Sequence, residues 1–251
     1  MMDESPLITV VVPSFNQGRY LAENLATIFA QDVPVEVFVM DGGSTDGTKA
    51  IIESWSSRLA GWRSHPDGGQ AAAINEGAAR GTAPFVYWLN SDDLLLPGGL
   101  RKLADALQAA AGKPAVYGRV YNFHERSGTR TPSRVEPFRE SRLALRCIVA
   151  QPGVLVRRTC WEKVGGLDAS LHMALDYDLW WRLYLAFGPL HFLPEFVAVN
   201  RVHDATKTAS FRSAHYREAI ATVRRHHGHV PVKWLLLRPY AVWWKSGFRE
   251  F

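Results

Sequence analysis

The sequence predicts an α/β protein with a mostly parallel sheet flanked by helices, and three observations support that fold class. Uninterrupted apolar runs, such as residues 7–12 and 35–40, are typical of strands that are buried on both faces. Apolar residues at helical spacing follow these runs through residue 110. Loops rich in Gly, Asp, Asn and Ser separate the two kinds of segment. Strands that alternate with helices in this way pair in parallel through right-handed crossovers.

The first half of the chain contains the clearest elements. We expect strands where a short apolar run ends in a polar loop, at residues 7–12, 35–40, 62–64 and 84–89. We expect helices where apolar residues recur at helical spacing, at residues 20–29, 51–55, 70–80 and after Gly99.

The second half has a different pattern, with shorter elements and no clear linker. A hairpin about Ser127-Gly128 is expected between residues 115–124 and a strand from Thr129. Further strands are expected at residues 153–156 and 191–199, and helices at residues 138–148, 161–166 and 176–187. We expect this half to complete the sheet and to form the wall that faces a second substrate.

Composition describes an ordinary globular protein with enough chain to bury a substantial core. Its 251 residues are 47% hydrophobic and 21% charged, and the formal charge is +5. The two cysteines, Cys147 and Cys160, are too few for a disulfide framework and are expected to be reduced. The acidic start of the chain lacks the pattern of a signal peptide, and no apolar run is long enough to span a bilayer. These features predict a cytoplasmic protein.

Paired carboxylates, Asp92 and Asp93, follow the expected strand at residues 84–89 directly. Two adjacent negative charges at the end of a buried strand are unfavourable unless a positive group lies beside them. A divalent cation is the usual solution, since Mg²⁺ prefers oxygen ligands and is often shared between carboxylates and substrate phosphates. The alternative is a solvated turn in which an aspartate caps the next helix.

Two other polar loops are expected at the same edge of the sheet, residues 14–16 and 41–46. Asp41, directly after a buried strand, suits hydrogen bonding to a nucleotide base or ribose. Ser44 and Asp46 are expected to serve only the tight turn and the cap of the following helix.

The sequence resembles the family-2 glycosyltransferases with the GT-A fold. The resemblance lies in residues 10–16 (VVVPSFN), 40–48 (MDGGSTDGT), 67–70 (DGGQ), 75–77 (NEG), 89–93 (LNSDD), 174–182 (ALDYDLWWR) and 200–203 (NRVH). It implies an inverting transfer of a sugar from a nucleotide diphosphate donor, with a UDP-sugar expected, assisted by Mn²⁺ or Mg²⁺. The acceptor it implies is a glycan or a lipid-linked molecule in the synthesis of cell-surface polysaccharide.

The resemblance also implies roles for individual residues. The expected metal ligands are Asp92, Asp93 and His203, and Asp176 is expected to be the catalytic base. The expected donor-binding residues are Pro13, Ser14, Phe15, Asn16, Asp41, Asp67, Gln70, Asn75, Asn90 and Ser91. Asn90 departs from the family pattern, because many members have an aspartate there, and it brings no charge to the metal. Asp178 is expected to pair with Arg182 one helical turn away.

The resemblance divides the chain into three expected parts. Residues 1–112 would bind the nucleotide sugar, residues 113–212 would face the acceptor, and residues 213–251 would form a basic, aromatic helical tail. The Trp, Leu, Arg and Lys content of residues 230–251 suits peripheral contact with the inner face of a membrane. The alternatives are packing on the protein's own core or on a second copy in a homodimer. No recognisable nucleic-acid-binding module is present, so no nucleic-acid partner is expected.

Two other functions were weighed against transfer. A sugar-phosphate nucleotidyltransferase would use a similar sheet and two carboxylates, but it would carry a glycine-rich phosphate loop with an arginine after the first strand. Residues 14–18 (SFNQG) do not have that form. A non-catalytic carbohydrate-binding protein would have no need for Asp92, Asp93 and Asp176 together.

Overall fold

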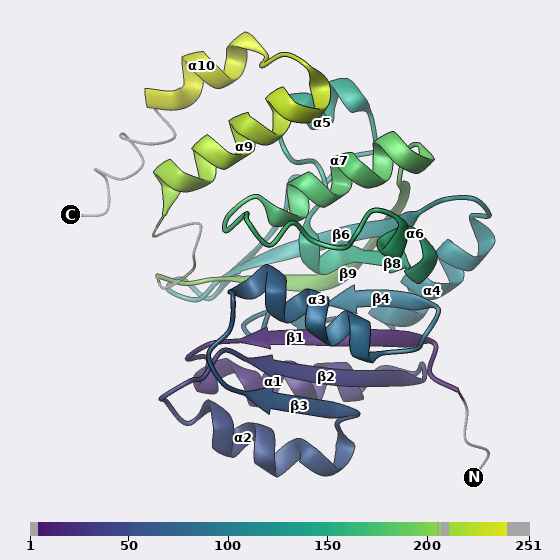
Figure 1. Cartoon of the computed structure of the whole chain (residues 1–251), viewed down its shortest axis with the longest axis vertical. Helices are drawn as coiled ribbons and strands as arrows, with labels where there is room; N and C mark the ends of the chain where they lie inside the picture. The colour runs from purple at the N-terminus through teal and green to yellow at the C-terminus, as the bar shows by residue number, and fades with distance from the viewer. Residues whose placement is uncertain (1–4, 205, 207–210, 240–251) are drawn as a thin grey trace.

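The computed structural model describes residues 5–204, 206 and 211–239. Within them, a nine-stranded sheet in the order β3-β2-β1-β4-β8-β6-β9-β5, with β7 paired to β6, has helices on both faces (Figure 1). The predicted α/β class with a central sheet flanked by helices is therefore confirmed.

The first half of the sheet is parallel, as the uninterrupted apolar runs predicted. β1 (Ile8–Ser14) pairs with β2 (Val35–Asp41) and with β4 (Phe85–Trp88), and β2 pairs with β3 (Gly61–Ser64). β1 and β4 are buried along their whole length, which is why their sequences do not alternate between apolar and polar residues. Ser14 stands opposite Asp41 in this register, so the polar loops after the two strands begin side by side.

The second half of the sheet is mixed rather than mostly parallel. β8 (Val154–Arg157) lies between β4 and β6 (Ala115–His124) and is antiparallel to both. β6 and β7 (Thr129–Pro132) form the predicted hairpin, and β9 (His191–Val202) runs parallel to β6. The long β9 carries the chain to the same edge at which β4 ends.

Two elements differ from expectation. β5 (Leu94–Leu95), which pairs with β9, is too short to leave a pattern in the sequence. The helix expected at residues 138–148 is only α5 (Glu140–Leu145), because Arg146 adopts an extended conformation. Glu136 accepts hydrogen bonds from Arg142 and Arg146, and these bonds fix the chain where the helix ends.

Two sets of helices bury the two faces of the sheet. α1 (Gly18–Phe29), α2 (Thr48–Trp55) and α4 (Gly99–Ala109) contribute to one core cluster. The other cluster receives side chains from α3 (Gln70–Arg80), α6 (Arg158–Lys163), α7 (Leu175–Phe187) and α9 (Arg212–His227). In that cluster the fully buried rings of Trp88 and Trp180 stack with centroids 5.7 Å apart. This contact fixes α7 against the strand that precedes the paired carboxylates.

The C-terminal helices pack on the body of the protein. α9 lies beside α7, and α10 (Val232–Pro239) follows it (Figure 1). Trp234 donates from Nε1 to the carbonyl oxygen of Ala144 at 2.7 Å, and its ring meets Tyr216 edge-on. The alternative in which the tail packs on the protein's own core is thus present at Trp234, while residues 240–251 lie outside the described residues.

Gly99→Ala is expected to destabilise the protein, because α4 begins in direct contact with β9. A Cβ at Gly99 would overlap the carbonyl oxygen of Val197, a backbone atom that cannot move aside. Overpacking of this kind typically costs about 1–3 kcal/mol. Chemical denaturation should show that loss for Gly99→Ala. Gly47→Ala, where a Cβ would have no neighbour within 4 Å, is the control. Equal stability of the two variants would contradict the close packing.

Candidate active site

A cleft of about 980 Å³ opens at the carboxyl ends of β1, β2, β3 and β4. It brings together ten of the residues predicted from the sequence: Pro13, Ser14, Phe15, Asp67, Gln70, Asn90, Ser91, Asp92, Asp93 and Asp176. Residues from the second half, among them Cys147, Gln151, His172, Met173 and Arg201, close the opposite wall. The volume and the convergence of polar groups suit a ligand larger than a single sugar.

Asp92 and His203 meet beside this cleft although they are far apart in the sequence. Nε2 of His203 lies 3.0 Å from Oδ2 of Asp92, and His203 is buried directly after the end of β9. The ring of Tyr20 covers His203, with centroids 4.9 Å apart. The side chain of Asp92 is 18% exposed and lines the cleft.

Asp93 is hydrogen-bonded within the turn, and its role as a metal ligand stays a prediction. It is 1% exposed, and it accepts hydrogen bonds from the backbone amide of Arg201 at 2.9 Å and from Nδ2 of Asn90 at 3.3 Å. Burial, followed by the charge of Asp92, raises the pKa of Asp93 well above its usual range. These hydrogen bonds fix the turn, and Asp93 lines the cleft together with Asp92.

The donor set fits a divalent cation that is shared with a substrate. Among the described residues, no group of three or more His, Cys, Asp or Glu side chains is arranged to hold a metal ion. One carboxylate and one imidazole would leave most coordination positions to phosphate oxygens and water. Mg²⁺ in nucleotide-binding proteins is usually held by one or two carboxylates together with substrate phosphates, and the imidazole would be a further ligand here. The pair therefore suits a cation that arrives with a diphosphate rather than a closed structural metal site.

Asn90 is held by protein groups on both sides of its carboxamide. Its Oδ1 accepts a hydrogen bond from Nε2 of Gln70 at 2.8 Å, and its Nδ2 lies 3.2 Å from Oε1 of Gln151. Gln151 in turn donates to the carbonyl oxygen of Trp88 at 2.8 Å. An aspartate at position 90 could not donate to Gln151 or to Asp93. This network gives a physical reason for the departure from the family pattern at this position.

Asp41 and Asn16 lie behind the cleft and shape its loops. Asp41 is fully buried, and its carboxylate accepts hydrogen bonds from the amides of Gly43 and Ser44 and from the hydroxyls of Ser44 and Ser64. Asn16, in the left-handed region at φ 53°, accepts from the amide of Thr45 at 2.9 Å. Neither side chain lines the cleft. In this structure Asp41 holds the loop that lines the cleft, and its contact with a base or ribose stays a prediction.

The loop after β1 offers a polar group and an apolar surface to a ligand. The hydroxyl oxygen of Ser14 is buried and has no hydrogen-bond partner within the described part of the chain. Phe15 is 62% exposed, which is unusual for a large aromatic side chain. Both line the cleft. An unpaired hydroxyl beside an exposed ring is the arrangement expected where a planar ring and its sugar bind.

The turn after β3 is fixed by a buried cation. Arg63, 6% exposed, forms an ion pair of 2.8 Å with Asp67 and donates to the carbonyl oxygen of Asp41. Asp67 also accepts from the amide of Gly69 at 2.7 Å. Asp67 and Gln70 are thereby presented to the cleft at the start of α3.

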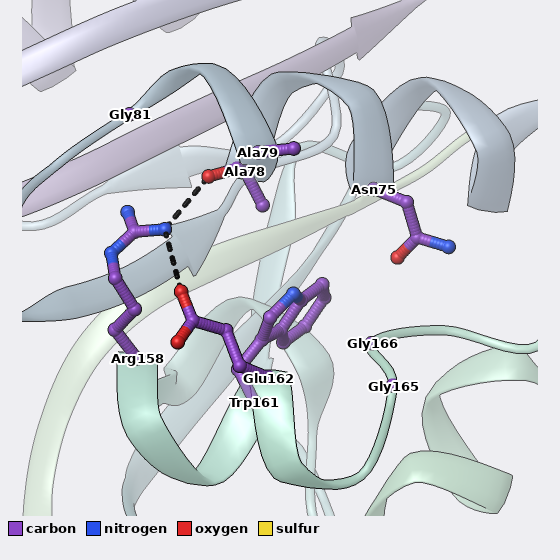
Figure 2. A pocket seen from close by; sticks show the side chains of 9 residues that line it. All are labelled: Asn75, Ala78, Ala79, Gly81, Arg158, Trp161, Glu162, Gly165 and Gly166. Carbon is purple, nitrogen blue, oxygen red and sulfur yellow. Dashed lines mark hydrogen bonds and ion pairs between the residues drawn. The ribbon is translucent and has the colours of Figure 1, made fainter.

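Asn75, which was predicted to bind the donor, lies elsewhere. Its carboxamide donates to the carbonyl oxygen of Leu167 and accepts from the amide of Leu167, each at 2.8 Å. It lines a separate cavity of about 430 Å³ between α3 and α6, beside which Arg158 pairs with Glu162 (Figure 2). Asn75 thus lies outside the cleft, where it joins α3 to the loop before α7.

Asp176 reaches the cleft from the first turn of α7. One carboxylate oxygen accepts the amide hydrogen of Tyr177 at 2.8 Å. Burial raises the pKa of Asp176 above the ordinary value, and the Tyr177 amide and the charge of His215 on α9 oppose that shift. A carboxylate with a raised pKa at the wall of a cleft is suited to accept a proton.

Asp178 has the structural role that its pairing with Arg182 predicted. It is fully buried, lies 2.6 Å from Nε of Arg182 and also contacts Nε2 of His226 on α9 at 2.7 Å. Burial alone would raise the pKa of Asp178, but the hydrogen bonds from His226 and Arg182 lower it below the ordinary value. The predicted ion pair is confirmed, and the contact with α9 adds a link that the sequence did not predict.

Asn24 and Arg201 are among the buried side chains of the site that were not predicted. Asn24, on the apolar face of α1, donates to the carbonyl oxygens of Asn90 and Asp93 at 2.9 and 2.8 Å. Arg201 donates to the carbonyl oxygen of Asp92 and pairs with Glu23. A polar residue between Leu21, Leu25 and Ile28 on a helix was the available signal for Asn24. Arg201 lies within a quoted motif, but its partners are not readable from the sequence.

Comparisons with known proteins agree with this geometry. The model of the family described as Glycosyl transferase family 2 matches residues 9–159, which is more than half of the chain. An uncharacterized glycosyltransferase of Rickettsia typhi is 27% identical over 216 residues, and the match covers 81% of this chain and 66% of that protein. This chain therefore spans just under two thirds of that relative's length.

Solved structures share the fold. The structure of S. aureus TarS 1–349 in complex with UDP-GlcNAc has a TM-score of 0.70 at 19% identity, covering 96% of this chain and 74% of that one. The mannosyltransferase PcManGT from Pyrobaculum calidifontis, in complex with GDP-Man and Mn²⁺, has a TM-score of 0.67 at 22% identity. That match covers 95% of this chain and 70% of the mannosyltransferase. These likenesses confirm the predicted GT-A fold.

Proposed function

The chain belongs to glycosyl transferase family 2, and from that membership we propose that it is an inverting glycosyltransferase. It moves a sugar from a UDP-sugar to a hydroxyl group of a glycan or lipid-linked acceptor in the synthesis of cell-surface polysaccharide. The observation that carries the proposal is that Asp92 and Asp176 open onto the same cleft from opposite halves of the chain. Asp92 lies on the side of the cleft that is proposed to hold the diphosphate, and Asp176 lies on the side that is proposed to admit the acceptor.

The proposed reaction is a single displacement at the anomeric carbon. Asp176 takes the proton of the acceptor hydroxyl as its oxygen attacks that carbon from the face opposite the diphosphate. The bond between the anomeric carbon and the diphosphate oxygen breaks, and its electron pair leaves with the nucleoside diphosphate. Attack from the opposite face inverts the configuration of the sugar. The pKa of Asp176, raised by burial, makes it a stronger base than an ordinary aspartate.

Asp92 and His203 are proposed to hold Mn²⁺ or Mg²⁺ together with the diphosphate. The cation supplies positive charge where the leaving group becomes more negative. The protein presents the Asp92 carboxylate at a fixed distance from His203. Arg201 and Asn24 hold the backbone of the turn that carries Asp92. The mannosyltransferase structure with GDP-Man and Mn²⁺ supports the use of a divalent cation in this fold.

The loops after β1 and β3 are proposed to bind the nucleoside. Ser14 and Phe15 offer a hydroxyl and a ring, and Asp67 is held toward the cleft by Arg63. UDP is the proposed nucleotide, since TarS of the same fold binds UDP-GlcNAc.

A screen of nucleotide sugars tests the proposal. UDP-, GDP-, dTDP- and CMP-sugars are added with and without Mn²⁺, and the melting temperature of the protein is measured. A ligand at 100 times its Kd adds about 2.7 kcal/mol of stability. We expect a UDP-sugar to raise the melting temperature only in the presence of the metal. A protein that none of these compounds stabilises with either Mn²⁺ or Mg²⁺ would contradict the proposal.

The rate of transfer is expected to depend on pH through Asp176. A base must be ionised to accept a proton, so kcat/KM should rise with pH through the pKa of Asp176 and then level off. Because burial raises that pKa, the rise should be centred above about 4, the value of an ordinary aspartate. Asp176→Asn should remove this rise from the residual rate. A residual rate that keeps the same pH profile would assign the base to another group.

The exposed side of α10 is proposed to contact an anionic membrane surface. Val232 and Leu236 are 65% and 74% exposed beside the cation Lys233. No helix in the described part of the chain combines the length and the apolar content needed to cross a bilayer. Cosedimentation with phosphatidylglycerol vesicles should fall for Val232→Glu/Leu236→Glu and should be absent with phosphatidylcholine vesicles. If the substitutions instead change the oligomeric state in size-exclusion chromatography, this surface is a dimer contact.

A further inference from the structure

The segment that leads into α7 is held by a residue of another helix. Ala174 is the N-cap of α7 and has no side chain that could accept a hydrogen bond. Glu218 of α9 supplies a carboxylate to the three amides that precede Leu175, the first residue of α7. Its Oε2 accepts from the amide of Met173 at 2.7 Å and from that of Ala174 at 3.0 Å, and both oxygens accept from His172 at 3.2 and 3.3 Å.

The contact with Glu218 holds residues 172–174, a segment on the proposed acceptor side of the cleft. His172 and Met173 line the cleft, and so do Leu175 and Asp176 of the first turn of α7. Three consecutive amides without partners at this place would have to turn toward water or toward the cleft. Hydrogen bonds from amides to a carboxylate are stronger than those to a neutral acceptor, and a negative charge is favourable at a helix N-terminus.

We propose that Glu218 is a positioning residue for the catalytic base. By closing the His172–Ala174 segment onto α9, it fixes the first turn of α7 and thereby the direction of the Asp176 carboxylate. The inference rests on the proposed function, in which Asp176 takes the proton of the acceptor. It makes α9 a part of the acceptor site, although α9 lies outside the residues that the family model matches.

A residue of α5 that contacts both α7 and α9 provides a matched control. Glu140 of α5 accepts from the hydroxyl of Tyr184 at 2.8 Å and contacts Nδ1 of His227 at 3.1 Å. Tyr184 lies in the last turn of α7 and His227 is the last residue of α9, and neither lines the cleft. Glu140→Ala therefore weakens the docking of α9 on α7 at the end remote from Asp176.

Hydrogen exchange tests the contact with Glu218 directly in the full-length protein. The amides of residues 172–174 are expected to exchange at least about tenfold faster in Glu218→Gln than in the wild type, since a neutral side chain can accept fewer and weaker bonds. Glu140→Ala should leave the exchange of these amides unchanged. Unchanged exchange in both Glu218→Gln and Glu218→Ala would overturn the proposal. The exchange result does not require activity, so it remains decisive even if wild-type protein transfers no sugar, a result that would overturn the proposed function instead.

Transfer assays test whether the contact with Glu218 acts through Asp176. A misplacement of about 1 Å can cost roughly 100-fold in rate, so turnover in Glu218→Ala should fall by about 10- to 100-fold. The Kd of the donor with Mn²⁺ should stay within a few-fold of wild type, and Glu218→Asp should restore part of the rate. In the Asp176→Asn background, adding Glu218→Ala should change the residual turnover less than about twofold. Additive losses, or an equal loss in Glu140→Ala, would assign Glu218 to general stability and overturn the positioning role.

Discussion

Asp176→Asn is expected to lower turnover by roughly two to four orders of magnitude, the usual contribution of general base catalysis. Asparagine keeps the size of the side chain but cannot take the proton of the acceptor. Binding of the nucleotide sugar with metal, measured by calorimetry, should stay within a few-fold of wild type, because the base does little for the donor in the ground state.

Thermal unfolding separates this loss of rate from a loss of structure. Burial raises the pKa of Asp176, so the folded state favours its neutral form. Its contribution to stability is present below the unfolded pKa and is lost as pH rises through the folded value. At neutral pH the ionised group therefore costs stability. Asp176→Asn should unfold at the same temperature as wild type or at a higher one.

Asp178→Asn is the control for Asp176→Asn. Asp178 is buried against Arg182 and His226, and removing one partner of a buried ion pair costs about 3–5 kcal/mol. We expect Asp178→Asn to lose stability while the folded fraction keeps most of its rate. If a folded Asp178→Asn protein is inactive and Asp176→Asn is active, the base has been assigned to the wrong carboxylate.

Asp92→Asn is expected to abolish measurable transfer and to remove the dependence of nucleotide binding on the metal. An amide brings no charge to a divalent cation, and in the described residues Asp92 is the carboxylate that meets His203 beside the cleft. Calorimetric titration of UDP should give similar Kd values with and without Mn²⁺ in Asp92→Asn, and values at least about tenfold apart in the wild type.

Asp93→Asn tests whether the two adjacent carboxylates, Asp92 and Asp93, have different roles. Asp93 accepts from the amide of Arg201 and from Asn90 inside the turn, so its substitution should act on stability. Metal-dependent binding of UDP should persist in the folded protein. Normal turnover and normal Mn²⁺ dependence in Asp92→Asn would contradict the assignment of the metal to Asp92.

The sequence predicted the parallel half of the sheet because physical constraints there are local. Runs such as residues 8–12 are buried on both faces, so the apolar pattern and the strand coincide. The antiparallel insertion of β8 between β4 and β6 is not local, since it depends on which of several short strands pair. β5 consists of Leu94 and Leu95, and only its pairing with Ala198 and Val199 makes it a strand.

The sequence predicted the site residues that directly follow strands. It did not predict the contacts between residues that are far apart in the sequence. Loops at the carboxyl ends of β1 to β4 converge by topology, so most predicted cleft residues do line the cleft. Asp92 and Asp93 both line the cleft, but no sequence pattern tells that Asp93 is the more deeply buried of the two. Glu218 holds a segment about 45 residues earlier, and a glutamate on a basic helix carries no signal of that partner.

A crystal structure of the protein with UDP and Mn²⁺ tests the central claim most directly, since the anomalous signal of manganese locates the cation. We predict a manganese peak beside the Asp92 carboxylate and the His203 ring, with the diphosphate bound to it and the uracil near Ser14 and Phe15. A nucleotide bound in the cavity beside Arg158 and Glu162, or a manganese ion bound away from Asp92, would contradict the account.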